Sequence, residues 1–289
     1  MNRRRLPRNV KLLGWTSFFT DVGSEMILPI LPLFLRGPLA APMWAIGLIE
    51  GGAEAVANGM RLVSGFASDR AGKAKPFVLL GYGLSTLTKP VLALATIWPV
   101  VLGLRFLDRG GKGLRSAPRD ALVAGSTPQA MFGRAYGYHR AMDTGGALVG
   151  SSIAGAVIWW LGGVSSSSVR WVFAASIVPS ALALLFIGPV TEPRIPPAPK
   201  GSGPARGGFH LTPAAWLLLA GVALWELANF SYAFVLLRLP DLGVPERYVP
   251  LGYIGFNVVY LLAAMPFGHL IDRLGIRAAL LPAPLAGAA

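Results

Sequence analysis

Residues 65–73 read GFASDRAGK, and residues 268–277 read GHLIDRLGIR. Both stretches have the pattern G-x-x-x-D-R-x-G with basic residues close behind, and both stand at the end of a long apolar run. Each of these runs is the second in its own half of the chain. An internal repeat at equivalent places indicates a protein built from two related halves.

The composition around the repeat is typical of a protein whose solvent is a lipid bilayer. The chain is 54% hydrophobic and 13% charged, whereas a soluble domain carries about 25% charged residues. Its apolar residues form long runs instead of the periodic pattern of half-buried elements. Eight runs reach the roughly 20 residues that cross a bilayer core, so each predicts a membrane-spanning helix. They lie at about 12–35, 43–66, 77–97, 98–118, 136–161, 170–190, 213–236 and 250–269.

The net charge of +13 follows the predicted topology. With the N-terminus in the cytoplasm, about seventeen Lys and Arg residues fall in inside segments and about four fall outside, which is the positive-inside pattern. Every basic cluster adjoins an apolar run, so we expect no nucleic-acid partner. The sequence therefore predicts a multi-pass protein of the bacterial inner membrane with a cytoplasmic N-terminus.

One segment differs from the rest in composition. Residues 191–209, TEPRIPPAPKGSGPARGGF, are rich in Pro, Gly and basic residues. Such a segment cannot bury a core and predicts a flexible linker. Six apolar runs precede it and others follow, so we expect an N-terminal six-helix bundle at 1–190, a cytoplasmic linker at 191–212 and an incomplete C-terminal bundle at 213–289.

The repeated motif resembles the loop 2–3 signature of the major facilitator superfamily, with its degenerate copy in loop 8–9. LRFLDRGG at 104–111 is similar to the fourth-helix arginine motif of that family. GALVGS at 146–151 resembles the fifth-helix element of its antiporters, with Ser151 where the family has proline. FFTDVGSEM at 18–26 and RSAPRDA at 115–121 resemble a little-characterised prokaryotic branch.

This resemblance implies an all-α membrane protein with two six-helix bundles around a central cavity that opens to alternate sides. The chain would supply the N-terminal bundle and the first two to three helices of the C-terminal bundle. Residues 278–289 read as the start of a ninth helix that ends early. We therefore expect a C-terminally truncated transporter, with a genuine eight-helix permease as the alternative.

The resemblance also implies a conformational latch at the repeated motif. Its expected residues are Gly65, Asp69, Arg70 and Gly72 in the first copy and Asp272 and Arg273 in the second. Asp120, at the inner end of the fourth run, is the expected partner of Arg70. Packing alone also explains the glycines, since they permit close helix approach and a tight turn.

Acidic side chains within the apolar runs predict a proton-coupling site. Ionisable groups in a bilayer are costly and mark pathways or relays. Two acids stand four residues apart on the first run and two on the second, so each pair shares a helix face. A structural ion network is the alternative for Glu50. The expected proton-coupling and cavity residues are Asp21, Glu25, Glu50, Glu54, Arg105 and Glu226.

The sequence argues against an enzyme. It has no cysteine, which excludes disulfides and thiol chemistry, and it has no metal-ligand spacing, nucleophile elbow or phosphate loop. We expect no cofactor and no metal; the expected partners are a small-molecule substrate, protons and membrane lipid. The preferred hypothesis is a secondary transporter that exports a small amphiphilic or drug-like molecule by proton antiport. The alternatives are a proton-linked uptake permease and a non-transporting fragment, and the oligomeric state stays open.

Overall fold

The structure is a computed structural model that describes residues 6–193, 212–228, 231–259 and 262. The described residues form helices, turns and loops without a strand. The chain divides into two compact units, residues 1–194 with 233–257 and residues 195–232 with 258–289. In the second unit the structure describes the helix α9 (Pro213–Ala228).

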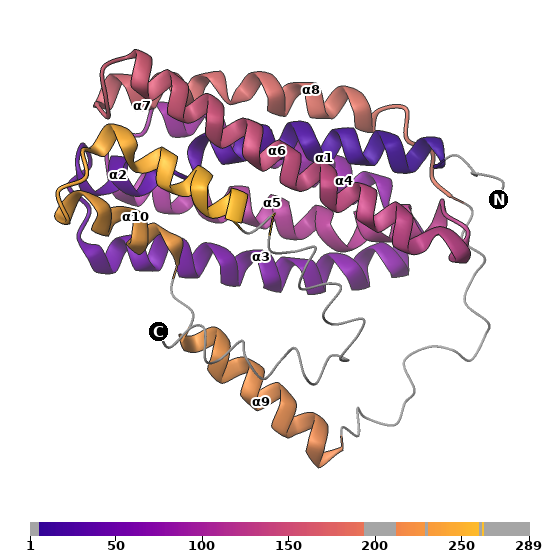
Figure 1. The fold of residues 1–289 in the computed structure, drawn as a ribbon. Helices are drawn as coiled ribbons and strands as arrows, with labels where there is room; N and C mark the ends of the chain where they lie inside the picture. The colour runs from indigo at the N-terminus through magenta and orange to yellow at the C-terminus, as the bar shows by residue number, and fades with distance from the viewer. Residues whose placement is uncertain (1–5, 194–211, 229–230, 260–261, 263–289) are drawn as a thin grey trace. The chain divides into compact units, whose positions relative to one another are not determined.

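The first unit is a bundle of long helices that run side by side (Figure 1). The predicted spans 43–66, 77–97, 98–118 and 136–161 each become one helix, namely α3 (Met43–Ala71), α4 (Lys75–Ala93), α5 (Trp98–Gly125) and α6 (Phe132–Trp160). Shorter elements lie between or after these helices, namely η1 (Gln129–Met131), α10 (Tyr232–Asp241), η2 (Glu246–Tyr248) and a helix at 249–259. The expected all-α fold is confirmed.

The predicted spans 12–35 and 170–190 are each divided into two helices. The predicted span 213–236 falls on α9 and on the start of α10. The run 12–35 gives α1 (Arg8–Ile27) and α2 (Leu31–Arg36), and the run 170–190 gives α7 (Ser166–Ala175) and α8 (Ile177–Ile187). Pro29 stands in the first break, and Pro179 lies in the first turn after the second. Proline cannot donate the backbone hydrogen bond that would continue a helix, which explains both interruptions.

Helix α1 packs against α6 and α8, and α5 packs against α3 and α4. Glycines allow the backbones to touch at these crossings. A Cβ added at Gly113 of α5 would overlap the carbonyl oxygen of Ala57, and one at Gly146 of α6 would overlap that of Phe18. Small residues at helix interfaces are the usual way in which membrane helices approach closely.

The outer surface of the bundle suits a lipid environment. Within the described part of the chain, three helical segments are long and apolar enough to cross a membrane, Arg8–Arg36, Gln129–Trp160 and Ser166–Ile187. Large apolar side chains such as Phe66, Leu94 and Trp160 are exposed on the outside. Exposed apolar surface on this scale is unfavourable in water and expected in a bilayer.

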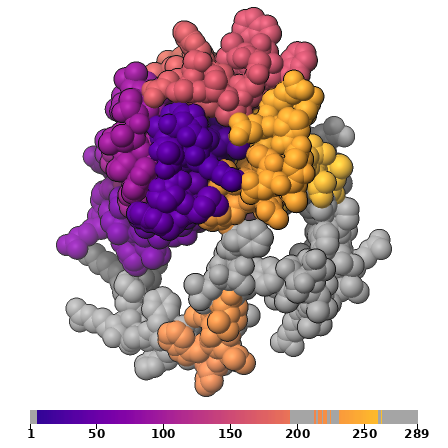
Figure 2. Space-filling model, turned by 90° about the vertical axis from the view of Figure 1, so that its left-hand side faces the viewer, coloured from indigo at the N-terminus to yellow at the C-terminus, as the bar shows by residue number. Residues whose placement is uncertain are grey.

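The segment 233–257 belongs to the first unit although it follows the predicted linker. A Cβ added at Gly155 of α6 would lie 3.6 Å from both Pro250 and Ile254, so the helix at 249–259 packs on α6. A Cβ at Gly47 of α3 would lie 3.5 Å from Phe234 of α10. Figure 2 shows this segment, in orange and yellow, against the indigo N-terminal residues.

Candidate transport site

Asp21 and Glu25 project from α1 toward the surface where α6 packs. A Cβ added at Gly146 would lie 3.1 Å from the Cβ of Asp21, and one at Gly150 would lie 3.0 Å from the Cβ of Glu25. Both acids are half-buried. The two glycines belong to the element at 146–151, so this element makes room for the two acidic residues of α1.

Charges of both signs surround Asp21. Its carboxylate interacts electrostatically with two acids, Asp143 and Glu25, and with two cations, Lys112 and Arg115. The cations come from α5 and Asp143 comes from α6. Because isolated charges are costly in a bilayer, the acids and cations depend on one another for compensation.

Glu25 accepts a hydrogen bond from the segment that follows the predicted linker. The Tyr253 hydroxyl donates a hydrogen bond of 2.6 Å to Oε2 of Glu25. Tyr253 is 6% exposed. Glu25 also interacts electrostatically with Arg105, Arg109 and Lys112 of α5. The sequence analysis missed Tyr253, because a single tyrosine in an apolar run is also typical of a membrane-interface anchor.

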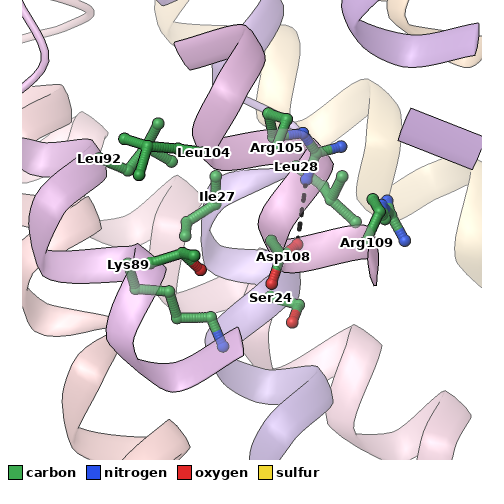
Figure 3. A pocket seen from close by; sticks show the side chains of 10 residues that line it. Ser24, Ile27, Leu28, Lys89, Leu92, Leu104, Arg105, Asp108 and Arg109 are labelled. Carbon is green, nitrogen blue, oxygen red and sulfur yellow. Dashed lines mark ion pairs between the residues drawn. The ribbon is translucent and has the colours of Figure 1, made fainter. Parts of the chain in front are cut away.

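Arg105 joins two acids in a buried network. Its Nη2 lies 3.4 Å from Oε1 of Glu50. Its Nη1 lies 3.5 Å from Oδ2 of Asp108, and Figure 3 shows this second pair. The exposed fractions of the three side chains are 5% for Arg105, 9% for Glu50 and 18% for Asp108. This geometry matches the structural alternative that the sequence left open for Glu50.

A small cavity lies beside this network. It has a volume of about 20 Å³ and is lined by residues of α1, α4 and α5, among them Lys89 and Asp108 (Figure 3). Such a volume holds about one water molecule. Lys89 is 2% exposed, and its Nζ donates a short hydrogen bond to the Ser180 hydroxyl. Ser180 in turn donates to the carbonyl oxygen of Ser176 at 2.8 Å.

The structure separates the second predicted acid pair. Glu50 lies in the buried network with Arg105, whereas Glu54 is exposed on α3. Glu54 interacts electrostatically with Lys112 of α5, which also interacts with Asp21. Lys112 of α5 therefore interacts with one acid on each of two other helices, Asp21 on α1 and Glu54 on α3.

The first copy of the repeated motif forms the end of α3. Gly72 takes the left-handed conformation, with φ of 61°, and its N–H reaches the carbonyl oxygens of Asp69 and Ser68. This is the usual role of a C-terminal glycine. A Cβ at Gly65 would meet the Cβ of Ala117 at an ordinary 3.5 Å. The motif glycines thus have a packing and turn role.

The charged residues of the motif lie at the surface. Asp69 and Arg70 are exposed. Asp120, the expected partner of Arg70, lies 3.2 Å from Nη2 of its neighbour Arg119. A latch through Asp69, Arg70 and Asp120 therefore stays a prediction.

Three predicted residues cannot be placed in the site. Asp272 and Arg273, the second copy of the latch, lie outside the described residues. Glu226 belongs to α9, but its side chain lies outside the described part of the chain. Among the residues that the structure describes, no group of three or more His, Asp and Glu side chains could hold a metal ion.

A second contact joins α2 to the segment after the linker. Nη2 of Arg36 lies 2.9 Å from Oδ1 of Asp241, and its Nη1 donates to the carbonyl oxygen of Leu237 at 3.1 Å. Asp241 lies beyond the predicted span 213–236. The hydrogen bond from Arg36 holds the pKa of Asp241 below its ordinary value of 3.8.

A bundle of apolar helices with charged side chains in its interior is typical of a multi-pass membrane protein. The sequence matches the Major Facilitator Superfamily over residues 13–289. The chain belongs to this family, which points to a transporter rather than an enzyme.

A relative that is named as an MFS-type transporter agrees with this assignment. The chain is 34% identical over 287 residues to an uncharacterised MFS-type transporter of Methanocaldococcus jannaschii, covering 96% of this chain and 70% of that protein. It is 27% identical over 286 residues to an uncharacterised protein of Mycobacterium tuberculosis, covering 93% of this chain and 67% of that protein.

Solved structures show the same fold at low sequence identity. A bacterial homologue of the human lysosomal transporter Spinster, in an inward-facing conformation, has a TM-score of 0.73 and 18% identity over 93% of this chain. The chain spans 63% of the length of that protein. A D-xylose–proton symporter has a TM-score of 0.66 and 14% identity over 92% of this chain and 69% of its own.

Proposed function

We propose that the chain acts in proton-coupled secondary transport, with Asp21 and Glu25 as the groups that bind and release the proton. The position of these acids carries the proposal. They are half-buried on α1, beside the backbone of α6 and the cations of α5. A carboxyl in such surroundings changes its charge when its access to water or to a partner changes.

The proposed direction is export of a small amphiphilic molecule in exchange for protons. Its support is the element at 146–151, which resembles the antiporter motif and whose Gly146 and Gly150 adjoin Asp21 and Glu25. A carboxylate suits exchange because its ionised form attracts a cationic substrate group and its protonated form does not. The second candidate is proton-linked uptake, which would use the same acids with the opposite direction of substrate flow.

The proposed topology has a cytoplasmic N-terminus in a bacterial inner membrane. Residues 1–190 would form the N-terminal bundle, 191–212 a cytoplasmic linker and 213–289 part of the C-terminal bundle. The distribution of Lys and Arg supports this orientation.

Everted membrane vesicles test the coupling. The vesicles come from a bacterial host without its own multidrug exporters, respiration acidifies their interior, and an acridine dye reports the gradient. Ethidium serves as the probe substrate. We expect its addition to release protons in vesicles with the unchanged chain, and Asp21→Asn and Glu25→Gln to abolish the release.

Glu246→Gln is the matched control, because Glu246 is an exposed acid on η2. It should release protons like the unchanged chain. Ethidium movement without proton movement would contradict the coupling, and so would full proton release by Asp21→Asn and Glu25→Gln. Accumulation of ethidium under an inward proton gradient in right-side-out vesicles would favour uptake.

A further inference from the structure

We propose that Tyr253 couples the charge of Glu25 to the docking of the segment that follows the linker. The ionised carboxylate holds the helix at 249–259 against α1, and protonation releases it. This inference rests on the proposed proton site at Glu25 and adds the residue that responds to the proton.

The hydrogen bond between the two residues has the geometry of a charge-assisted bond. Its length of 2.6 Å falls in the range for a hydroxyl that donates to a carboxylate, and such bonds are roughly twice as strong as neutral ones. Tyr253 is buried, so water competes poorly for the bond. A protonated Glu25 is neutral and accepts more weakly, so the contact weakens when the proton binds.

The other groups around Glu25 belong to the N-terminal bundle. The charged ones are Asp21 on α1 and Arg105, Arg109 and Lys112 on α5. Among the helices packed on α1, α6 contributes the backbone of Gly150 next to Glu25, with Asp143 facing Asp21. Helix α8 has no titratable side chain, and Arg170 of α7 donates to the carbonyl oxygens of Ala93 and Ala95. Tyr253, by contrast, lies after the linker, so its bond depends on how that segment docks.

The contact between Arg36 and Asp241 provides an internal reference. The lowered pKa of Asp241 keeps this carboxylate ionised at neutral and mildly acidic pH. Between about pH 5 and pH 8 the Arg36–Asp241 pair therefore stays charged. A change in docking over this range would have to arise elsewhere, and the proposal assigns it to Glu25.

Disulfide trapping measures the docking directly. A Cβ at Gly155 would lie 3.6 Å from the Cβ of Pro250, within the spacing of about 3.5–4.5 Å that a disulfide requires. The chain has no cysteine of its own. The variant Gly155→Cys with Pro250→Cys should therefore cross-link only across this interface.

The rate of cross-linking is measured in proteoliposomes from about pH 5 to pH 8 and divided by the rate in the same variant with Glu25→Gln added. This ratio cancels the ionisation of the thiols, which is common to both proteins. We expect the ratio to rise to about tenfold at the high end, the effect of one hydrogen bond to a charged group. It should fall toward one as the pH decreases.

Tyr253→Phe should remove the pH dependence of the ratio, and Tyr253→Phe combined with Glu25→Gln should cross-link no more slowly than either change alone. Tyr248→Phe, on η2 of the same segment, should leave the ratio unchanged. A ratio that stays flat with pH, or a full pH response in Tyr253→Phe, overturns the inference. Proton-coupled ethidium movement with a flat ratio would leave the proposed function standing, whereas a pH-dependent ratio without such movement would leave this inference standing.

Discussion

Replacement of Arg105 by methionine would show how far the buried ion network stabilises the bundle. Arg105 lies 3.4 Å from Glu50 and 3.5 Å from Asp108. At these distances each contact is worth on the order of 5 kcal/mol at an effective dielectric constant of about 20, before the cost of desolvation. Removing the cation takes the ion-pair partner from Glu50 and Asp108. Breaking a buried pair in this way costs about 3–5 kcal/mol.

Thermal unfolding in detergent, followed by circular dichroism, measures this loss. We expect Arg105→Met to lower the melting temperature by on the order of 10 °C. Arg36→Met is the matched control, because it removes an arginine from an exposed ion pair, and such pairs contribute little. Equal melting temperatures for the two variants would refute the structural role of Arg105 and favour a role in the cavity alone.

Two further predictions concern packing and pH. Gly113→Leu should destabilise the bundle by about 1–3 kcal/mol through overpacking, because its Cβ would overlap the carbonyl oxygen of Ala57, whereas Gly103→Leu has open space around its Cβ and should not; urea unfolding in detergent compares them, and equal losses would contradict the close contact. The lowered pKa of Asp241 means that its stabilising contribution is complete above 3.8 and is lost as the pH falls through the lowered value. The carboxyl ¹³C shift of Asp241 should therefore stay constant from about pH 8 to pH 5 and change below it, while an inflection above pH 5 would contradict the ion pair with Arg36.

The long apolar runs were sufficient to predict the helices, because a bilayer demands about 20 apolar residues per crossing. Hydropathy could not predict that the runs 12–35 and 170–190 would break. Pro29 and Pro179 are visible in the sequence, but proline in a membrane helix can either kink it or interrupt it. Which one occurs depends on how neighbouring helices satisfy the freed backbone groups, and a single sequence does not contain that information.

The residues of the candidate site were predictable where an ionisable side chain lies in an apolar run, because its burial in a bilayer costs free energy. The cost of intramembrane charge singled out Asp21, Glu25, Glu50 and Arg105. Their partners were not predictable, because i, i+4 spacing defines a shared face without saying what packs on it. Glu50 and Glu54 share such spacing, yet the first meets Arg105 in the interior and the second is exposed.

The arrangement of charges suggests how one proton could alter the docking of the segment that follows the predicted linker. Asp21 and Glu25 lie on α1 and the cations around them lie on α5, so a proton that binds there changes the net charge of this cluster. The segment after the linker packs on α3 and α6 and also contacts this bundle through the polar pairs Arg36–Asp241 and Glu25–Tyr253. The first pair stays charged near neutral pH, because the pKa of Asp241 is lowered. A proton-dependent change in the docking of this segment would therefore begin at Glu25–Tyr253.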